Sequence, residues 1–349
     1  MSADTVGDET CVAKLVAQYF QLVEPRELCV PSAEAIVRPA VQAAIYEQMF
    51  NEATVWPLPP AGYRTRVLKM IISRIEESIS NPEEDEIIDD LMTSWSELIA
   101  QPKKSPLEQA QQLSYVKYTA PKSQVNEESR TVVTSESRGL ILSAGTTGFR
   151  TWEAALHLGT FLSTPEGESL VRGKRVIELG AGTGFLSLYC AKYLNVQNVL
   201  VTDREPALIT NIQDCLSRNE LQGRRIWPAI WEWGSNLEEP SRSEESCEPW
   251  RFDIALGADL IYDVDLVPLL VSTSRNLFEN YKLEEFIISA TLRNQDTFKV
   301  FLDACETNQF QIEKVRFESP PAEAQTGFFH STSIPIEIYR ITPPIKTDR

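Results

Sequence analysis

The stretch Arg175-Val-Ile-Glu-Leu-Gly-Ala-Gly-Thr-Gly184 decides the fold of this chain. Residues 175–179 form a short apolar run typical of a buried strand, and residues 185–194 are predicted to form a helix. The glycines between them can adopt backbone angles closed to other residues, and they let the main chain lie close to a ligand. The stretch therefore predicts a strand, a tight turn and a helix, with a nucleotide-type ligand at the carboxyl end of the strand.

After residue 151 the sequence alternates short apolar runs with amphipathic stretches. Strands that alternate with helices predict a largely parallel sheet with helices on both faces. The last two strands, 315–317 and 334–341, have no obvious helix between them, so an antiparallel hairpin at one edge is expected. The predicted fold class is α/β, with a Rossmann-like sheet of seven strands. The other predicted strands are 175–179, 198–202, 226–230, 252–256 and 286–290, and the predicted helices are 185–194, 207–219, 266–281 and 297–307.

The first part of the chain has a different pattern, with apolar residues at helical spacing. Pro39 is expected near a first turn or at a kink. We divide the chain into a helical N-terminal domain (1–110) for substrate docking, a connecting segment (111–150) and a catalytic domain (151–349). Residues 235–249, rich in Glu and Ser, predict a surface loop. The helices expected in the N-terminal domain lie within residues 12–20, 35–49, 63–79 and 91–98.

The composition is that of an acidic globular chain of 349 residues with a net charge of −17. A direct nucleic-acid partner is not expected, because phosphate binding requires clustered Lys and Arg. No apolar run of about 18 residues is present and the N-terminus is acidic, so we expect neither a membrane span nor a secretory signal. We expect a cytoplasmic monomer. Six cysteines without a C-x-x-C pair and only two histidines, His157 and His330, argue against disulfides and against a metal site.

Two acidic residues limit which kinds of ligand the glycine turn can bind. Glu178 stands two residues ahead of Gly180, and Asp203 ends the second predicted strand, where a carboxylate can bind both ribose hydroxyls of an adenosine. The spacing is G-x-G-x-G rather than the G-x-G-x-x-G of dinucleotide folds. This combination favours S-adenosylmethionine, with Glu178 bonded to its amino group, over another nucleotide cofactor or a purely structural turn. Alternatively, Glu178 caps nearby backbone amides.

Tryptophans stand at two places that a cofactor could touch. Trp152 precedes the first strand of the sheet, and Trp231 and Trp233 follow the third, where an adenine edge would lie. An indole face offers flat apolar area to adenine. Each tryptophan alternatively belongs to the core.

Asp259 and Tyr262 follow the fourth strand of the sheet, at the end that faces the transferred methyl group. An amine must be neutral to attack, and the ordinary pKa of lysine, about 10.4, leaves little free base at neutral pH. A carboxylate here would capture and orient the amine, and desolvation would then favour loss of its proton. Alternatively, Asp259 caps the helix that follows.

Together these residues resemble the class I, seven-strand methyltransferase family 16, whose members mostly methylate lysines of proteins other than histones. The resemblance spans about residues 146–342. It implies a cofactor site and an acceptor-lysine site formed by Asp259 and Tyr262. Within the family, residues 146–155 and the stretch Thr291-Leu-Arg-Asn294 resemble the branch that trimethylates a lysine of eukaryotic elongation factor 2, as does the N-terminal extension. The implied cofactor residues are Trp152, Gly180, Ala181, Gly182, Asp203, Trp233 and Ala258.

The first hypothesis is therefore a protein-lysine N-methyltransferase that uses S-adenosyl-L-methionine, no metal and a protein substrate, elongation factor 2. Two other hypotheses remain open. One is an assembly factor that binds the cofactor without catalysis. The other is a methyltransferase for small molecules, in which the N-terminal domain covers a closed pocket.

Overall fold

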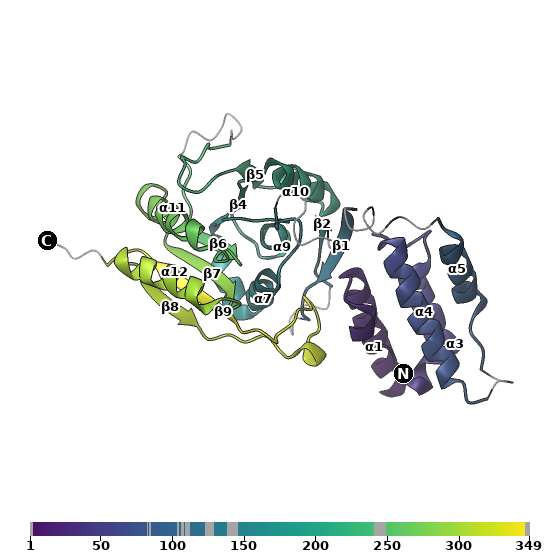
Figure 1. The fold of residues 1–349 in the computed structure, drawn as a ribbon. Helices are drawn as coiled ribbons and strands as arrows, with labels where there is room; N and C mark the ends of the chain where they lie inside the picture. The colour runs from purple at the N-terminus through teal and green to yellow at the C-terminus, as the bar shows by residue number, and fades with distance from the viewer. Residues whose placement is uncertain are drawn as a thin grey trace. The chain divides into compact units, whose positions relative to one another are not determined.

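A computed structural model describes residues 3–81, 83, 85–102, 105, 108, 112–122, 129–137, 146–240 and 249–345. The chain divides into two compact units, unit 1 (Met1–Thr119) and unit 2 (Ala120–Arg349) (Figure 1). The boundary falls inside the predicted connecting segment. Of the predicted surface loop 235–249, residues 241–248 lie outside the described residues.

Unit 1 is built from helices that surround their own apolar core. The face of α4 (Ala61–Ser78) shows why, since Val67, Ile71 and Ile75 follow one another at four-residue spacing and are all fully buried. The helix predicted over 35–49 is broken, because Pro39 begins a new helix and holds the residue before it in an extended conformation. The other elements are α1 (Ala3–Phe20), α2 (Ala33–Ile36), α3 (Pro39–Ile45), a π-helical turn (Tyr46–Phe50), α5 (Asp89–Ala100) and β1 (Ser114–Thr119).

Unit 2 contains a seven-stranded sheet in the order β5-β4-β3-β6-β7-β9-β8, which confirms the predicted fold class. The first five strands of this order run parallel to one another, and β9 is antiparallel to both of its neighbours. The strands are β3 (Arg175–Glu178), β4 (Asn198–Asp203), β5 (Ile226–Ile230), β6 (Ile254–Ala258), β7 (Glu285–Thr291), β8 (Gln311–Val315) and β9 (Ile336–Thr342); β2 (Thr131–Glu136) precedes them.

The predicted antiparallel pair at one edge of the sheet is confirmed. Strand β9 pairs with both β7 and β8, so β8 forms this edge. The predicted strand 315–317 is wrong in its bounds, since β8 ends at Val315. An edge strand needs no continuous apolar run. Because β8 is mostly polar and partly exposed, it lacks the apolar pattern from which a strand is predicted.

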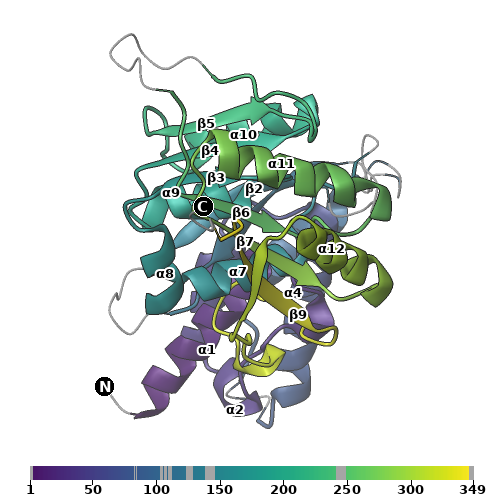
Figure 2. The same ribbon diagram turned by 90° about the vertical axis from the view of Figure 1, so that its left-hand side faces the viewer.

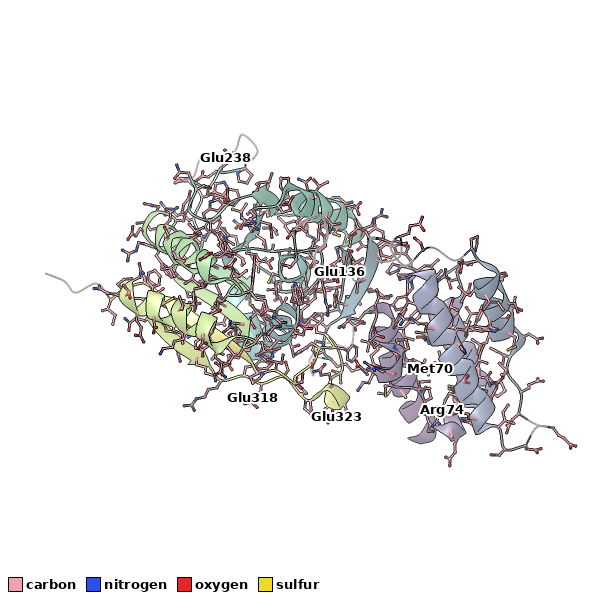
Figure 3. All side chains as sticks on the ribbon, viewed as in Figure 1. Met70, Arg74, Glu136, Glu238, Glu318 and Glu323 are labelled. Carbon is pink, nitrogen blue, oxygen red and sulfur yellow. The ribbon has the colours of Figure 1, made fainter. Side chains whose placement is uncertain are left out.

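Helices cover both faces of this sheet, with α7, α9 and α10 on one face and α11 and α12 on the other (Figures 1 and 2). Side chains fill the space between the layers (Figure 3). In the described ranges no helix combines the length and the apolar composition that a membrane crossing requires. The helices are α7 (Glu153–Leu162), α8 (Pro165–Val171), α9 (Phe185–Tyr193), α10 (Pro206–Arg218), α11 (Val267–Asn280) and α12 (Gln295–Thr307).

Candidate active site

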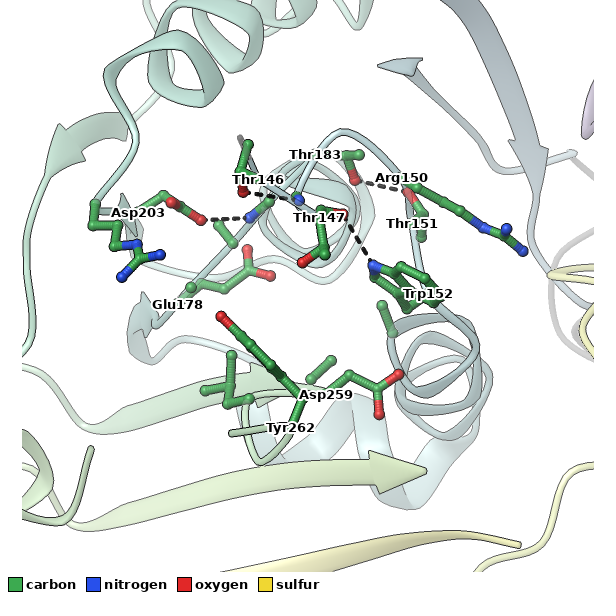
Figure 4. Close-up of a pocket in the computed structure, with 18 of the residues that line it drawn as sticks. Thr146, Thr147, Arg150, Thr151, Trp152, Glu178, Thr183, Asp203, Asp259 and Tyr262 are labelled. Carbon is green, nitrogen blue, oxygen red and sulfur yellow. Dashed lines mark hydrogen bonds between the residues drawn. The ribbon is translucent and has the colours of Figure 1, made fainter. Parts of the chain in front are cut away.

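A cavity of about 330 Å³ opens at the carboxyl ends of β3, β4 and β6 (Figure 4). Its volume lies in the range of small-molecule sites, and parallel strands bring the residues that follow them to this one edge. The structure places all ten of the predicted site residues in its lining. They are Trp152, Glu178, Gly180, Ala181, Gly182, Asp203, Trp233, Ala258, Asp259 and Tyr262.

The glycine turn is held against two neighbouring segments. Gly182 has a φ of +55°, and a Cβ atom added there would lie 3.0 Å from the carbonyl oxygen of Gly148. Its N–H donates to Oδ2 of Asp203 at 2.9 Å, and the N–H of Ala181 donates to the carbonyl oxygen of Thr202 at 2.9 Å. The turn is therefore fixed to the end of β4, and its close approach to Gly148 leaves no room for a side chain.

Asp203 is a nearly buried carboxylate between the glycine turn and α10. Its side chain also accepts a hydrogen bond from the N–H of Glu205 at 3.1 Å. Burial raises the pKa of Asp203, while the N–H groups of Gly182 and Glu205 act in the opposite direction. The two backbone donors orient the carboxylate at the edge of the cavity.

Glu178 performs the capping role that the sequence left open. Its Oε2 atom accepts hydrogen bonds from the backbone N–H of Ser187, at 3.0 Å, and from the Ser187 hydroxyl, both in the first turn of α9. The side chain also lines the cavity, so capping does not remove it from the site. Burial raises the pKa of Glu178 to about 7, against the effect of the Ser187 donors. This group therefore titrates near neutral pH in the folded protein.

The three predicted tryptophans separate into core and cavity wall. Trp231 is 2% exposed and donates from Nε1 to the carbonyl oxygen of Ser235 at 3.2 Å, so it belongs to the core, although it also borders the cavity. Trp233 is partly exposed and lies across from Gly180, whose added Cβ would be 3.3 Å from its ring. Trp152 also lines the cavity and donates from Nε1 to the carbonyl oxygen of Thr147 at 3.1 Å. The lining thus contains the indole rings of Trp152 and Trp233.

Asp259 leaves β6 with a φ of +51°, in the left-handed region that non-glycine residues rarely adopt. Its Oδ1 accepts from the N–H of Thr291 at 2.8 Å, and its Oδ2 accepts from the Thr291 hydroxyl at 3.1 Å and from the Arg293 guanidinium at 3.2 Å. The alternative role of Asp259 as a helix cap is wrong. Asp263 supplies that cap, by accepting from the N–H of Asp265 at 3.0 Å.

Tyr262 stands at the mouth of the cavity. The residue is 59% exposed, and its ring points across the cavity toward Glu178 (Figure 4). Partial burial raises the pKa of its phenol, so it stays protonated and can donate a hydrogen bond at neutral pH.

Sequence reasoning missed a buried network behind the glycine turn. Glu136, at the end of β2, is fully buried and accepts from the hydroxyl of Thr151 at 2.7 Å. The Thr151 hydroxyl in turn lies 2.7 Å from the hydroxyl of Thr183 in the turn. Nothing in the sequence links these residues, because they are 15 and 32 positions apart. Figure 4 shows the contact of Thr151 with Thr183.

Sequence reasoning also missed two arginines in the lining, Arg150 and Arg293. Their guanidinium carbons lie 5.0 and 5.3 Å from the centroid of the Trp152 ring. Arg293 was part of the stretch Thr291–Asn294 that supported the family resemblance, but the residue types alone gave it no role in the site.

A family model described as lysine methyltransferase matches residues 142–308. The protein-lysine N-methyltransferase EFM3 of Chaetomium thermophilum is 41% identical over 334 residues, which are 94% of this chain and 97% of that one. The Saccharomyces cerevisiae protein of the same name is 28% identical, over 76% of this chain and 79% of its own. The EEF1A lysine methyltransferase 3 of Mus musculus is 35% identical over 37% of this chain and 50% of its own.

The likeness to the Chaetomium enzyme extends over nearly the whole of both chains, and the family model covers the glycine turn, Asp203 and Asp259. The chain belongs to the lysine methyltransferase family, and it is an enzyme.

Proposed function

We propose that this enzyme transfers methyl groups from S-adenosylmethionine to a lysine of a protein substrate, and that this substrate is eukaryotic elongation factor 2. The observation that carries the proposal is the pairing of the glycine turn with Asp203, since the N–H of Gly182 donates to its carboxylate at 2.9 Å. This pairing would direct a carboxylate toward the place of an adenosine ribose, beside glycines that carry no side chain.

The residues of the cavity suit each part of this cofactor. Asp203 would bind the ribose hydroxyls, and Trp233 would lie against the adenine. Glu178 would face the amino group of the methionine part, using the carboxylate oxygen that does not bind Ser187. Gly180 and Gly182 would leave room for the methionine part of the cofactor. When bound, the cofactor supplies an electrophilic methyl group on a positively charged sulfur.

The acceptor side would be formed by Asp259 and Tyr262. A lysine amine attacks the methyl carbon as the carbon–sulfur bond breaks, and the amine must first lose a proton. Asp259 would bind the incoming ammonium, and the Tyr262 hydroxyl would orient the nitrogen. Alignment of nitrogen, carbon and sulfur then supplies much of the acceleration.

Two lines support a protein as the acceptor. The Chaetomium and Saccharomyces relatives are both called protein-lysine methyltransferases, and the first of them aligns with unit 1 as well as unit 2. Unit 1 has its own core, so we propose that it docks the substrate. The murine relative is named for a different elongation factor, EEF1A, which makes translation factors the substrate class to test first.

The experiment is to incubate the enzyme with radiolabelled S-adenosylmethionine and a lysate of cells deleted for its gene. A labelled band of the size of elongation factor 2, identified by mass spectrometry and absent with Asp203→Ala, supports the proposal. A labelled band identified as another elongation factor would show that the proposed substrate is wrong and that this factor is the substrate. Label in small molecules alone, or cofactor binding with no transfer, refutes a protein acceptor. Asp259→Ala is expected to abolish transfer and to leave cofactor binding intact.

A further inference from the structure

The carboxylate of Asp259 already holds a cation in this structure. The guanidinium of Arg293 donates to Oδ2 of Asp259 at 3.2 Å, and both residues line the cavity. A guanidinium and a lysine ammonium are both N–H donors with a full positive charge, so they compete for the same carboxylate. If Asp259 binds the acceptor lysine, Arg293 stands where that lysine must go.

Asp259 does not depend on Arg293 for its orientation. Its two oxygens accept from the backbone N–H of Thr291 at 2.8 Å and from the Thr291 hydroxyl at 3.1 Å. Its own N–H donates to the carbonyl oxygen of Ser289 at 2.9 Å. The carboxylate is therefore held by β7 on its own, and the longest of its hydrogen bonds is the one to Arg293.

Arg293 has further contacts that do not involve Asp259. Its other terminal nitrogen donates to Glu153 at 2.7 Å, and its guanidinium lies 5.3 Å from the centroid of the Trp152 ring. The side chain is 41% exposed, whereas that of Asp259 is 11% exposed. Arg293 can thus leave Asp259 while it keeps a carboxylate partner, an aromatic surface and contact with water.

We propose that Arg293 is a displaceable counter-ion of Asp259, which neutralises the acceptor site of the free enzyme and is exchanged for the ammonium of the substrate lysine. This inference rests on the proposed function, because it takes Asp259 as the group that binds the lysine. Each acceptor must expel the guanidinium before it is methylated. Arg293 therefore raises the KM for the acceptor without taking part in the chemical step.

The test is the steady-state kinetics of Arg293→Gln and Arg293→Lys with the protein that the wild-type enzyme labels. Arg293→Gln removes the charge and is expected to lower the KM for the acceptor roughly two- to fivefold, the ratio that corresponds to the energy of a partly exposed ion pair. Its kcat is expected to stay within about twofold of the wild type. Arg293→Lys keeps the charge, so the KM of this variant is expected to stay close to that of the wild type. Thermal unfolding checks that both variants are folded.

Arg150→Gln is the matched control. Arg150 also lies beside Trp152 and is 3.5 Å from Glu153, but its ion pair is with Glu153 rather than Asp259. It is expected not to lower the KM for the acceptor. An unchanged or raised KM in Arg293→Gln, or a large loss of kcat that Arg293→Lys restores, overturns the inference and makes Arg293 a positioning residue.

The two proposals fail in different ways. If the wild type labels a protein other than elongation factor 2, the proposed substrate is wrong, but the kinetic comparison proceeds with the labelled protein. If the wild type labels elongation factor 2 and the KM does not fall in Arg293→Gln, only the role of Arg293 is wrong. If no protein is labelled, both are refuted.

Discussion

Replacement of Gly182 by alanine, compared with a control glycine, separates the energetic cost of a positive φ from the cost of the close contact with Gly148. Alanine at a φ of +55° costs about 1–2 kcal/mol, and the more restricted unfolded chain returns about 0.4–1 kcal/mol. The new Cβ atom would lie 3.0 Å from the carbonyl oxygen of Gly148, so the two segments must move apart by a few tenths of an ångström. That movement disturbs the bond from the N–H of Gly182 to Asp203. We expect a loss of about 2 kcal/mol in the free energy of unfolding and about tenfold weaker binding of S-adenosylhomocysteine.

Gly173→Ala provides the matched control. Gly173 has a φ of +71°, and no heavy atom lies within 4 Å of its added Cβ, so this variant has the strain without the contact. It is expected to lose about 1 kcal/mol and to bind the cofactor product as the wild type does. Urea unfolding followed by tryptophan fluorescence reports on unit 2, which holds five of the seven tryptophans, and calorimetry gives the dissociation constants. Equal affinities in the two variants would refute the argument that the turn needs glycine for the ligand.

Two pH dependences follow from buried groups. Burial raises the pKa of Glu178 to about 7, so the ionised form that would bind the cofactor's amino group rises about fivefold between pH 6 and pH 7. Calorimetry is expected to show a similar gain in affinity for S-adenosylhomocysteine, which Glu178→Gln should lack; the same slope in that variant would exclude Glu178 as the cause. Because its folded pKa is raised, ionisation of Glu178 also lowers the stability of the cofactor-free enzyme as the pH rises from about 4.5 through 7. Burial and the neighbouring His330 lower the pKa of His157 to about 4, below its value in the unfolded chain. The stability that neutral His157 provides to the folded state is therefore fully present above about pH 6.5 and is lost as the pH falls toward 4. Between pH 7 and pH 4.5 the effects of Glu178 and His157 on the free energy of unfolding have opposite signs, so the wild type is expected to change little. His157→Asn keeps only the Glu178 effect and is expected to gain about 2 kcal/mol more than the wild type on this acidification, and equal changes in the two proteins, measured by urea unfolding, would contradict this.

Most of the site residues that the sequence predicted lie at or just after strand ends. Glu178, Asp203 and Asp259 each follow a recognisable apolar run, and parallel strands must bring such positions to one edge of the sheet. Their convergence in one cavity therefore needed no knowledge of long-range contacts.

The part that could not be predicted depends on pairs that are far apart in the chain. Arg293 meets Glu153 across 140 positions, and Glu136 is connected to the turn through Thr151. Periodicity shows that a residue is buried or exposed, but not which side chain it meets. The same limit applies to the order of the strands, since no local pattern states that β9 lies inside β8.

The position of β9 between β7 and β8 has a consequence for biosynthesis. A ribosome delivers β8 before β9, so β8 has no strand to join until residues 336–342 have been made. During that interval β7 carries an unpaired edge with buried-type residues such as Phe286 and Ile288, the kind of edge that pairs with other chains. Pairing with β9 also steadies Thr291, whose register partner is Ile336 and which holds Asp259. The strand that covers the β7 edge is therefore made after the rest of the sheet, and a chaperone that bound this edge would protect the chain until β9 is available.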